Sequence, residues 1–250
     1  MTVPPGLHEA KDVVAAIREG DTELLAAILE EEPGLALERV ADRSMLHHAT
    51  DWPGHWPNVA RSISLLVAAG ADVDAVFPHP DDPMKVRETP LHWGASSGDV
   101  AAIDALLDAG AAIDPLGGIF GGCTPFEEAV IFEKYAAASR LLERGAACYL
   151  PGAAALGRMD LVRGHFDDQG CVRSDVGVLP HWEALPPAQV LLDRAFQFAC
   201  RAGHLTIAMF LRERGANPTA TTPANTTALD EARKNEHEDI VAWLADLIES

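Results

Sequence analysis

The sequence predicts an all-α solenoid of about seven helix-turn-helix repeats with short β-finger loops, and two observations carry this prediction. First, the chain repeats itself: TPLHWGASSGDVAAIDALLDAGAAID begins at Thr89, and an equivalent threonine follows 35 residues later at Thr124. Second, apolar residues within a repeat have helical spacing, as Val100, Ile103 and Leu107 show at i, i+3 and i+7. One such repeat cannot bury its apolar face alone, so neighbouring repeats must stack.

The local chemistry of each repeat fits this prediction. The Thr89 hydroxyl can cap the first helix, and Pro90 occupies the first helical position, where its missing N–H is not needed. Gly110 and Gly215 follow apolar helices, where a left-handed cap residue is favoured. We expect one domain over residues 1–250. Its repeats lie near 7–43, 44–88, 89–123, 124–147, 148–193, 194–226 and 227–250.

These residues resemble the ankyrin repeat. The pattern of that family is TPLH, small residues, a glycine turn, a second apolar helix and GAD. It stands almost intact at Thr89–Asp114 and Gly203–Asn217, and looser copies cover nearly the whole chain. The spacings and the DWPGHWPN insertion are similar to a bacterial, actinomycete-type subset. The resemblance implies a concave groove, formed by the fingers and first helices, that binds a protein or peptide without a cofactor.

The charge of the chain restricts its partners. The 250 residues include 19 Lys and Arg against 38 Asp and Glu, for a formal net charge of −19. This field repels phosphate backbones and anionic lipid, so we expect no nucleic-acid or membrane partner and favour a basic one. The N-terminus has no signal-peptide pattern and no window reaches the roughly 20 apolar residues of a membrane span, which predicts a cytoplasmic protein. We also expect a monomer.

The four cysteines show no metal-ligand spacing, so free thiols and no metal site are expected. They are Cys123, Cys148, Cys171 and Cys200. The usual nucleotide-binding and serine-hydrolase motifs do not occur in the sequence.

Three insertions interrupt the repeats. DWPGHWPN lengthens the turn of the second repeat by about five residues, because eleven positions separate His47 from Asn58 where six separate His92 from Gly98. AVFPHPDDPMKVRE extends a finger, and GCVRSDVGVLPHWEALPP separates the fifth and sixth repeats. Loops displayed on a rigid stack are common places for recognition residues.

Two function hypotheses follow. The first is a protein- or peptide-binding adaptor that uses its concave groove and inserted loops. Its candidate binding residues are Asp51, Trp52, Trp56, His92, Trp93, His181 and Trp182. The second is a cofactor-independent enzyme or small-molecule binder, with proton-transfer chemistry of the isomerase, lyase or cyclase type. Its candidate catalytic residues are His48, His55, Glu127 and Glu128.

In the second hypothesis a histidine acts as general acid or base, a glutamate orients it, and tryptophan rings line the pocket. Each candidate also has a structural interpretation. His47 and His92 can bond to backbone in a neighbouring turn, and Trp52 and Trp56 can pack on the stack. Glu127 and Glu128 can be solvated or can form a paired acidic site facing His92.

Overall fold

The computed structural model describes residues 8–78, 86–173, 187–222 and 224–249. The predicted fold class is confirmed: the described residues form successive helix pairs of the ankyrin solenoid type, with two short hairpins between them. The chain packs into two compact parts. The N-terminal part is Met1–Ala146 and the C-terminal part is Ala147–Ser250.

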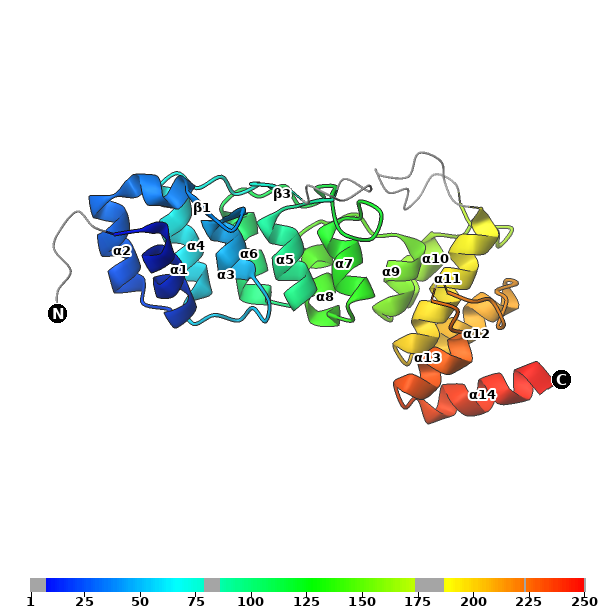
Figure 1. Cartoon of the computed structure of the whole chain (residues 1–250). Helices are drawn as coiled ribbons and strands as arrows, with labels where there is room; N and C mark the ends of the chain where they lie inside the picture. The colour runs from blue at the N-terminus through cyan, green and yellow to red at the C-terminus, as the bar shows by residue number, and fades with distance from the viewer. Residues whose placement is uncertain (1–7, 79–85, 174–186, 223, 250) are drawn as a thin grey trace. The chain divides into compact units, whose positions relative to one another are not determined.

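In the N-terminal part the helices form two layers (Figure 1). First helices of successive repeats pack on one another in one layer, and second helices pack in the other. The first helices are α1 (Ala10–Glu19), α3 (Met45–Thr50), α5 (Pro90–Ser97) and α7 (Pro125–Ile131). The second helices are α2 (Thr22–Glu31), α4 (Val59–Ala68), α6 (Val100–Asp108) and α8 (Tyr135–Glu143). A short 3₁₀ helix, η1 (Pro33–Leu37), follows α2.

Two β-fingers lie at one edge of this part (Figure 1). The first pairs β1 (Arg39–Val40) with β2 (Arg43–Ser44), and the second pairs β3 (Phe77–Pro78) with β4 (Arg87–Glu88); both are antiparallel. Each finger leads into a first helix, and that helix ends at the turn to its partner. Fingers and turns therefore occupy opposite edges of the stack.

The C-terminal part repeats the same plan. Its helices are α9 (Leu150–Ala155), α10 (Met159–Gly164), α11 (Ala188–Arg201), α12 (Leu205–Glu213), α13 (Ala228–Lys234) and α14 (Glu238–Glu249). Helix α11 packs on α9, α12 and α13. Its fully buried Phe196 belongs to an apolar core that also contains Leu211 and Leu244.

Reciprocal hydrogen bonds define where several first helices begin. At α7 the Thr124 hydroxyl accepts from the Glu127 N–H at 3.3 Å, and the Glu127 carboxylate accepts from the Thr124 N–H at 3.0 Å. Thr227 and Asp230 repeat this capping box at α13, with distances of 3.2 and 2.8 Å. The box satisfies backbone donors that the first helical turn leaves without partners.

Glycine turns let successive repeats approach closely in the C-terminal part. Gly203 has a φ of +83°, and a Cβ at this position would lie 2.7 Å from the ring of His237. The His237 Nε2 donates to the Arg201 carbonyl at 3.0 Å. His204 makes the same contact one repeat earlier, because its Nε2 lies 3.1 Å from the Ala155 carbonyl. In both cases a histidine of the later repeat bonds to a backbone carbonyl at the end of the first helix of the preceding repeat.

Candidate binding site at the fingers of the N-terminal part

The inserted loop (residues 51–58) lies at the turn edge and fastens three consecutive repeats. Asn58 donates its side-chain N–H to the Gly20 carbonyl at 2.9 Å, in the α1–α2 turn. The His55 backbone N–H donates to the Asp99 carboxylate at 2.7 Å, in the α5–α6 turn. These bonds hold the loop against the turns before and after it.

Two arginines contact this loop, and one of them, Arg43 in β2, connects it to the finger edge. The Asp51 carboxylate lies 3.1 Å from Arg43 Nη1 and 3.6 Å from Arg18 Nη2. The Arg18 guanidinium lies 5.7 Å from the Trp56 ring centroid, and that of Arg43 lies 5.3 Å from the Trp93 ring centroid. Both are cation–π distances. The two arginines carry no distinctive spacing in the sequence, and they were missed as site residues.

The two tryptophans of the loop have different environments. Trp56 is partly buried under Arg18, and its indole N–H is buried without a hydrogen-bond partner. Trp52 is 79% exposed, so the structural interpretation, in which both rings pack on the stack, is wrong for Trp52. The physical reason is that Gly54, His55 and Asn58 make the contacts with the neighbouring turns, which leaves Trp52 outside them.

At the finger edge, His47 and Trp93 lie under the second finger. The His47 ring lies edge-on to Trp93 with a centroid distance of 4.8 Å, and Trp93 lies 5.3 Å from the ring of Phe77 in β3. His47 Nε2 donates to the Glu88 carbonyl at 3.2 Å, while Nδ1 lies 2.8 Å from the Ser44 hydroxyl. Burial lowers the pKa of His47 to about 3, so the ring is neutral.

The side chains of His92 and His48 also form hydrogen bonds with backbone groups. His92 Nδ1 accepts from the Thr89 N–H at 3.1 Å and Nε2 donates to the Cys123 carbonyl at 3.0 Å. Burial lowers its pKa to about 4. His48 is also buried, which lowers its pKa, and its Nε2 donates to the Val40 carbonyl at 3.1 Å. Its Nδ1 is buried without a partner.

The two glutamates of α7 are buried and have different partners. Glu127 is the capping-box carboxylate of α7. Glu128 Oε1 accepts from the Ile119 N–H at 2.8 Å, and its acidic neighbour is Glu88 in β4. The two α7 glutamates therefore do not form a paired site facing His92, and solvation is also wrong for both. Burial, followed by the charge of Glu88, raises the pKa of Glu128 to about 8.

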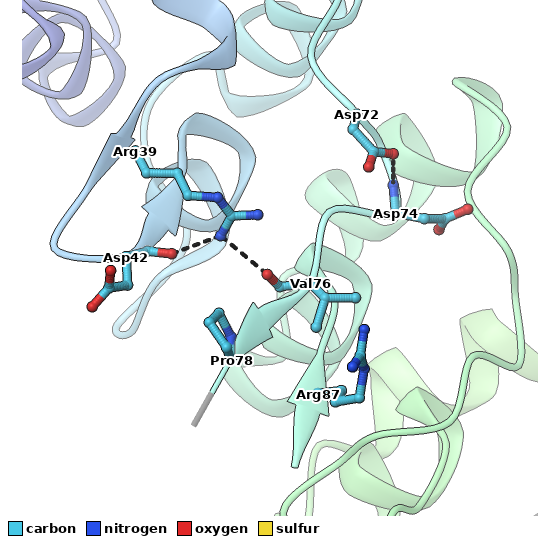
Figure 2. Close-up of a pocket in the computed structure, with 7 residues that line it drawn as sticks. All are labelled: Arg39, Asp42, Asp72, Asp74, Val76, Pro78 and Arg87. Atoms are coloured by element: carbon cyan, nitrogen blue, oxygen red, sulfur yellow. Dashed lines mark hydrogen bonds between the residues drawn. The ribbon is translucent and has the colours of Figure 1, made fainter. Parts of the chain in front are cut away.

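A cavity of about 430 Å³ lies between the two fingers (Figure 2). Its lining residues are Arg39, Asp42, Asp72, Asp74, Val76, Pro78 and Arg87. Arg39 Nη1 donates to the Asp42 carbonyl at 2.7 Å and to the Val76 carbonyl at 3.0 Å, so its guanidinium is held between the fingers. This volume falls within the range typical of ligand pockets.

The charged groups of this cavity do not neutralise one another by direct pairing. Asp74 accepts from the Ala112 N–H at 3.1 Å, and Asp72 accepts from the Asp74 N–H at 3.1 Å. Within the described ranges, neither Arg39 nor Arg87 forms an ion pair with the three lining aspartates. The cavity therefore presents charges of both signs that a bound partner can reach.

A second cavity of about 450 Å³ lies beside the inserted loop. Its lining residues are His55, Trp56, Asn58, Val59, Ala60, Arg61, Asp99 and Ala101. The sequence-predicted site is thus divided: His55 and Trp56 line this cavity, Trp93 lies under the second finger, and Glu128 is buried in α7. His181 and Trp182 lie outside the described residues. Among the described residues, no group of three potential metal ligands occurs, and no helix is long and apolar enough to cross a membrane.

Comparisons with known proteins agree with this architecture. Residues 86–114 match the family model described as the ankyrin repeat. Solved structures with significant similarity include the human ASB11 ankyrin repeat domain. That match has a TM-score of 0.53 and 20% sequence identity, and it covers 93% of this chain and 96% of that chain. No individually curated protein matches the sequence significantly. The chain therefore has the ankyrin-repeat fold.

Proposed function

We propose that this chain is a protein- or peptide-binding adaptor that uses the finger edge of its N-terminal part as the binding groove. Ankyrin-repeat domains generally bind proteins. The observation that carries the proposal is the cavity between the fingers, where Asp42 and Asp72 are exposed and, within the described ranges, form no ion pair with Arg39 or Arg87. A cavity whose arginines and aspartates form no ion pairs with one another favours binding of a charged or polar segment.

The proposed partner is basic. Residues 1–146 hold 24 of the 38 acidic residues and 10 of the 19 basic residues. The negative electrostatic field of these residues speeds the approach of a cationic peptide, and dissolved salt weakens this attraction. Asp42 and Asp72 are exposed at the cavity and can receive lysine or arginine side chains. A cytoplasmic monomer and the resemblance to an actinomycete-type subset remain predictions.

Peptide selection tests this proposal. Peptides chosen from a random-sequence display library against the whole chain should be enriched in lysine and arginine, and their affinity should fall as salt rises. The double variant Asp42→Asn/Asp72→Asn should weaken a selected peptide by about three- to tenfold. A charge-matched control, Glu236→Gln/Asp246→Asn, lies in the C-terminal part and should change little. Peptides without basic residues, or equal losses in both double variants, would contradict the proposal.

The enzyme or small-molecule alternative is not favoured by any specific observation. Neither of the two cavities described above is lined by His48, Glu127 or Glu128. His48 is buried and bonds to the Val40 carbonyl, and Glu128 bonds to the Ile119 N–H. His55 lines the second cavity. A general base has to reach the proton that it removes, and the burial of His48 and Glu128 does not favour this role.

A further inference from the structure

Arg39 lies in the finger cavity with only one nitrogen of its guanidinium group in use. Its Nη1 donates to the Asp42 carbonyl at 2.7 Å and to the Val76 carbonyl at 3.0 Å, which occupies both hydrogens of that nitrogen. Figure 2 shows both bonds on this nitrogen and none on the other terminal nitrogen. Within the described ranges, Nε and Nη2 form no hydrogen bond or ion pair, so one edge of the guanidinium group is open.

This open edge has the geometry that binds a carboxylate. The N–H groups of Nε and Nη2 point in the same direction within one plane, so they can donate two parallel hydrogen bonds to the two oxygens of one carboxylate. The bonds to Asp42 and Val76 hold the guanidinium group in place before a partner arrives, which reduces the entropy lost on binding. Arg39 is therefore oriented to receive a carboxylate.

The aspartates that line the cavity do not fill this position. Asp74 accepts from the Ala112 N–H with both carboxylate oxygens, at 3.1 and 3.3 Å. Asp72 Oδ1 accepts from the Asp74 N–H at 3.1 Å, and Asp42 contacts Arg39 through its backbone carbonyl. Connecting the two fingers does not use the open edge either, because Nη1 alone makes both of those bonds. Among the described residues, the cavity therefore does not supply the carboxylate that this edge can bind.

The cavity also contains a second cation. Arg87 of β4 lines it and, in the described part of the chain, forms no ion pair with the lining aspartates. A partner with positive charge alone would be attracted by Asp42 and Asp72 but repelled by both arginines. A segment that carries a carboxylate together with cationic groups would match both signs of charge. The arrangement of charges therefore favours a partner that is basic but not exclusively so.

We propose that the finger cavity binds a basic peptide segment through one carboxylate, which pairs with the Nε and Nη2 edge of Arg39. Lysine or arginine side chains of the same segment face Asp42 and Asp72, which are exposed at the cavity. The carboxylate is the free C-terminus of the partner or an acidic side chain within the segment, since both present the same two oxygens. This inference rests on the proposed function, because it names the partner of that same cavity.

A minimal probe tests this contact on the whole chain without any selected peptide. Nα-acetyl-lysine carries one carboxylate and one ammonium group, whereas its C-terminal amide carries only the ammonium group. Each is titrated while nitrogen–proton NMR follows the Nε–H signal of Arg39, which is assigned through its own side-chain carbons. The acid should shift this signal saturably, and the amide should shift it at least about threefold less. The Nε–H signal of Arg61, an exposed residue of α4, is the internal control and should not move.

Selected peptides test the same contact at full length. A basic peptide from the display library should lose about tenfold in affinity when its carboxylates are removed. Amidation of the C-terminus and replacement of acidic side chains by their amides are made separately, and the change that causes the loss identifies the source of the carboxylate. In Arg39→Lys, which keeps a charge but not two parallel donors, the loss should shrink to about threefold or less. Arg87→Gln leaves the bonds of Arg39 in place and should retain the loss seen in the natural chain.

The outcomes separate this inference from the proposed function. Equal shifts of the Arg39 signal by acid and amide, equal shifts at Arg39 and Arg61, or no saturable shift would overturn the carboxylate contact. Basic peptides that keep their affinity without any carboxylate, or that lose it equally in the natural chain and in Arg39→Lys, would also overturn it while leaving the proposed function in place. Failure to select any peptide would count against the proposed function, and the comparison of acid and amide would still decide whether Arg39 binds a carboxylate.

Discussion

The Asp51 carboxylate lies 3.1 Å from Arg43 Nη1, and this ion pair connects the inserted loop to the finger edge. Arg43 leads from β2 into α3 and lies over the Trp93 ring, so one carboxylate helps to position an aromatic contact in the next repeat. The loop thereby stabilises the candidate groove as well as the turns that it spans.

Replacing Asp51 with asparagine should destabilise the N-terminal part by about 1 kcal/mol, because two half-exposed arginines lose their shared anion. Urea unfolding at low and high salt measures this change, which salt should reduce. Asp42→Asn is the control, since the Asp42 side chain is exposed and forms no ion pair within the described ranges. Equal effects of both substitutions would show that the Asp51 pairs contribute nothing.

Trp52 and Trp56 should respond differently to alanine. Trp52→Ala should change the free energy of unfolding by less than about 0.5 kcal/mol, because the ring is 79% exposed. Trp56→Ala removes a partly buried ring from Arg18 and should cost about 2 kcal/mol. Thermal and urea unfolding compare the two variants. A larger loss for Trp52→Ala would contradict the loop geometry.

Acid should destabilise the N-terminal part through its buried histidines. The pKa of His47 is lowered to about 3 and that of His92 to about 4, from an ordinary value of 6.5. The unfolded chain therefore binds more protons than the folded one, and stability is lost as pH falls from about 6.5. Urea unfolding between pH 4 and 7 should show this slope.

A later repeat of this chain shows which substitution at His92 would keep its hydrogen bond. Gln197 occupies the equivalent position of a later repeat, and its Nε2 donates to the Ala220 carbonyl at 2.8 Å. His92→Gln should keep a hydrogen-bond donor for the Cys123 carbonyl. The number of protons that the chain takes up on unfolding in acid should fall by about one. An unchanged pH slope in this variant would show that His92 does not contribute to it.

Alanine at Gly203 should be destabilising by about 1–3 kcal/mol, because its φ of +83° disfavours a side chain and a Cβ would meet His237. Gly164→Ala is the control, since a Cβ there meets nothing within 4 Å and the residue ends helix α10. Thermal unfolding distinguishes the two substitutions. Equal melting temperatures would contradict the described turn.

The fold follows from local patterns that the sequence displays. A threonine cap three residues before His, Glu or Asp, and apolar residues at helical spacing, involve contacts within a few positions of the chain. Stacking is then the only way for each repeat to bury its apolar face. Fold class, repeat period and the structural role of His47 and His92 could therefore be predicted from the sequence.

The arrangement of the site depended on tertiary structure. Arg39 and Val76 are 37 positions apart in the sequence, and the Arg39 guanidinium reaches the Val76 carbonyl because the two fingers follow paths that no periodic pattern specifies. Trp52 is exposed and Trp56 is not because the loop contacts turns of two other repeats. Sequence by itself determined the helices and their stacking, since these rest on short-range contacts. Only the packed chain decided which irregular segments meet, since that depends on where distant backbone groups find their hydrogen bonds.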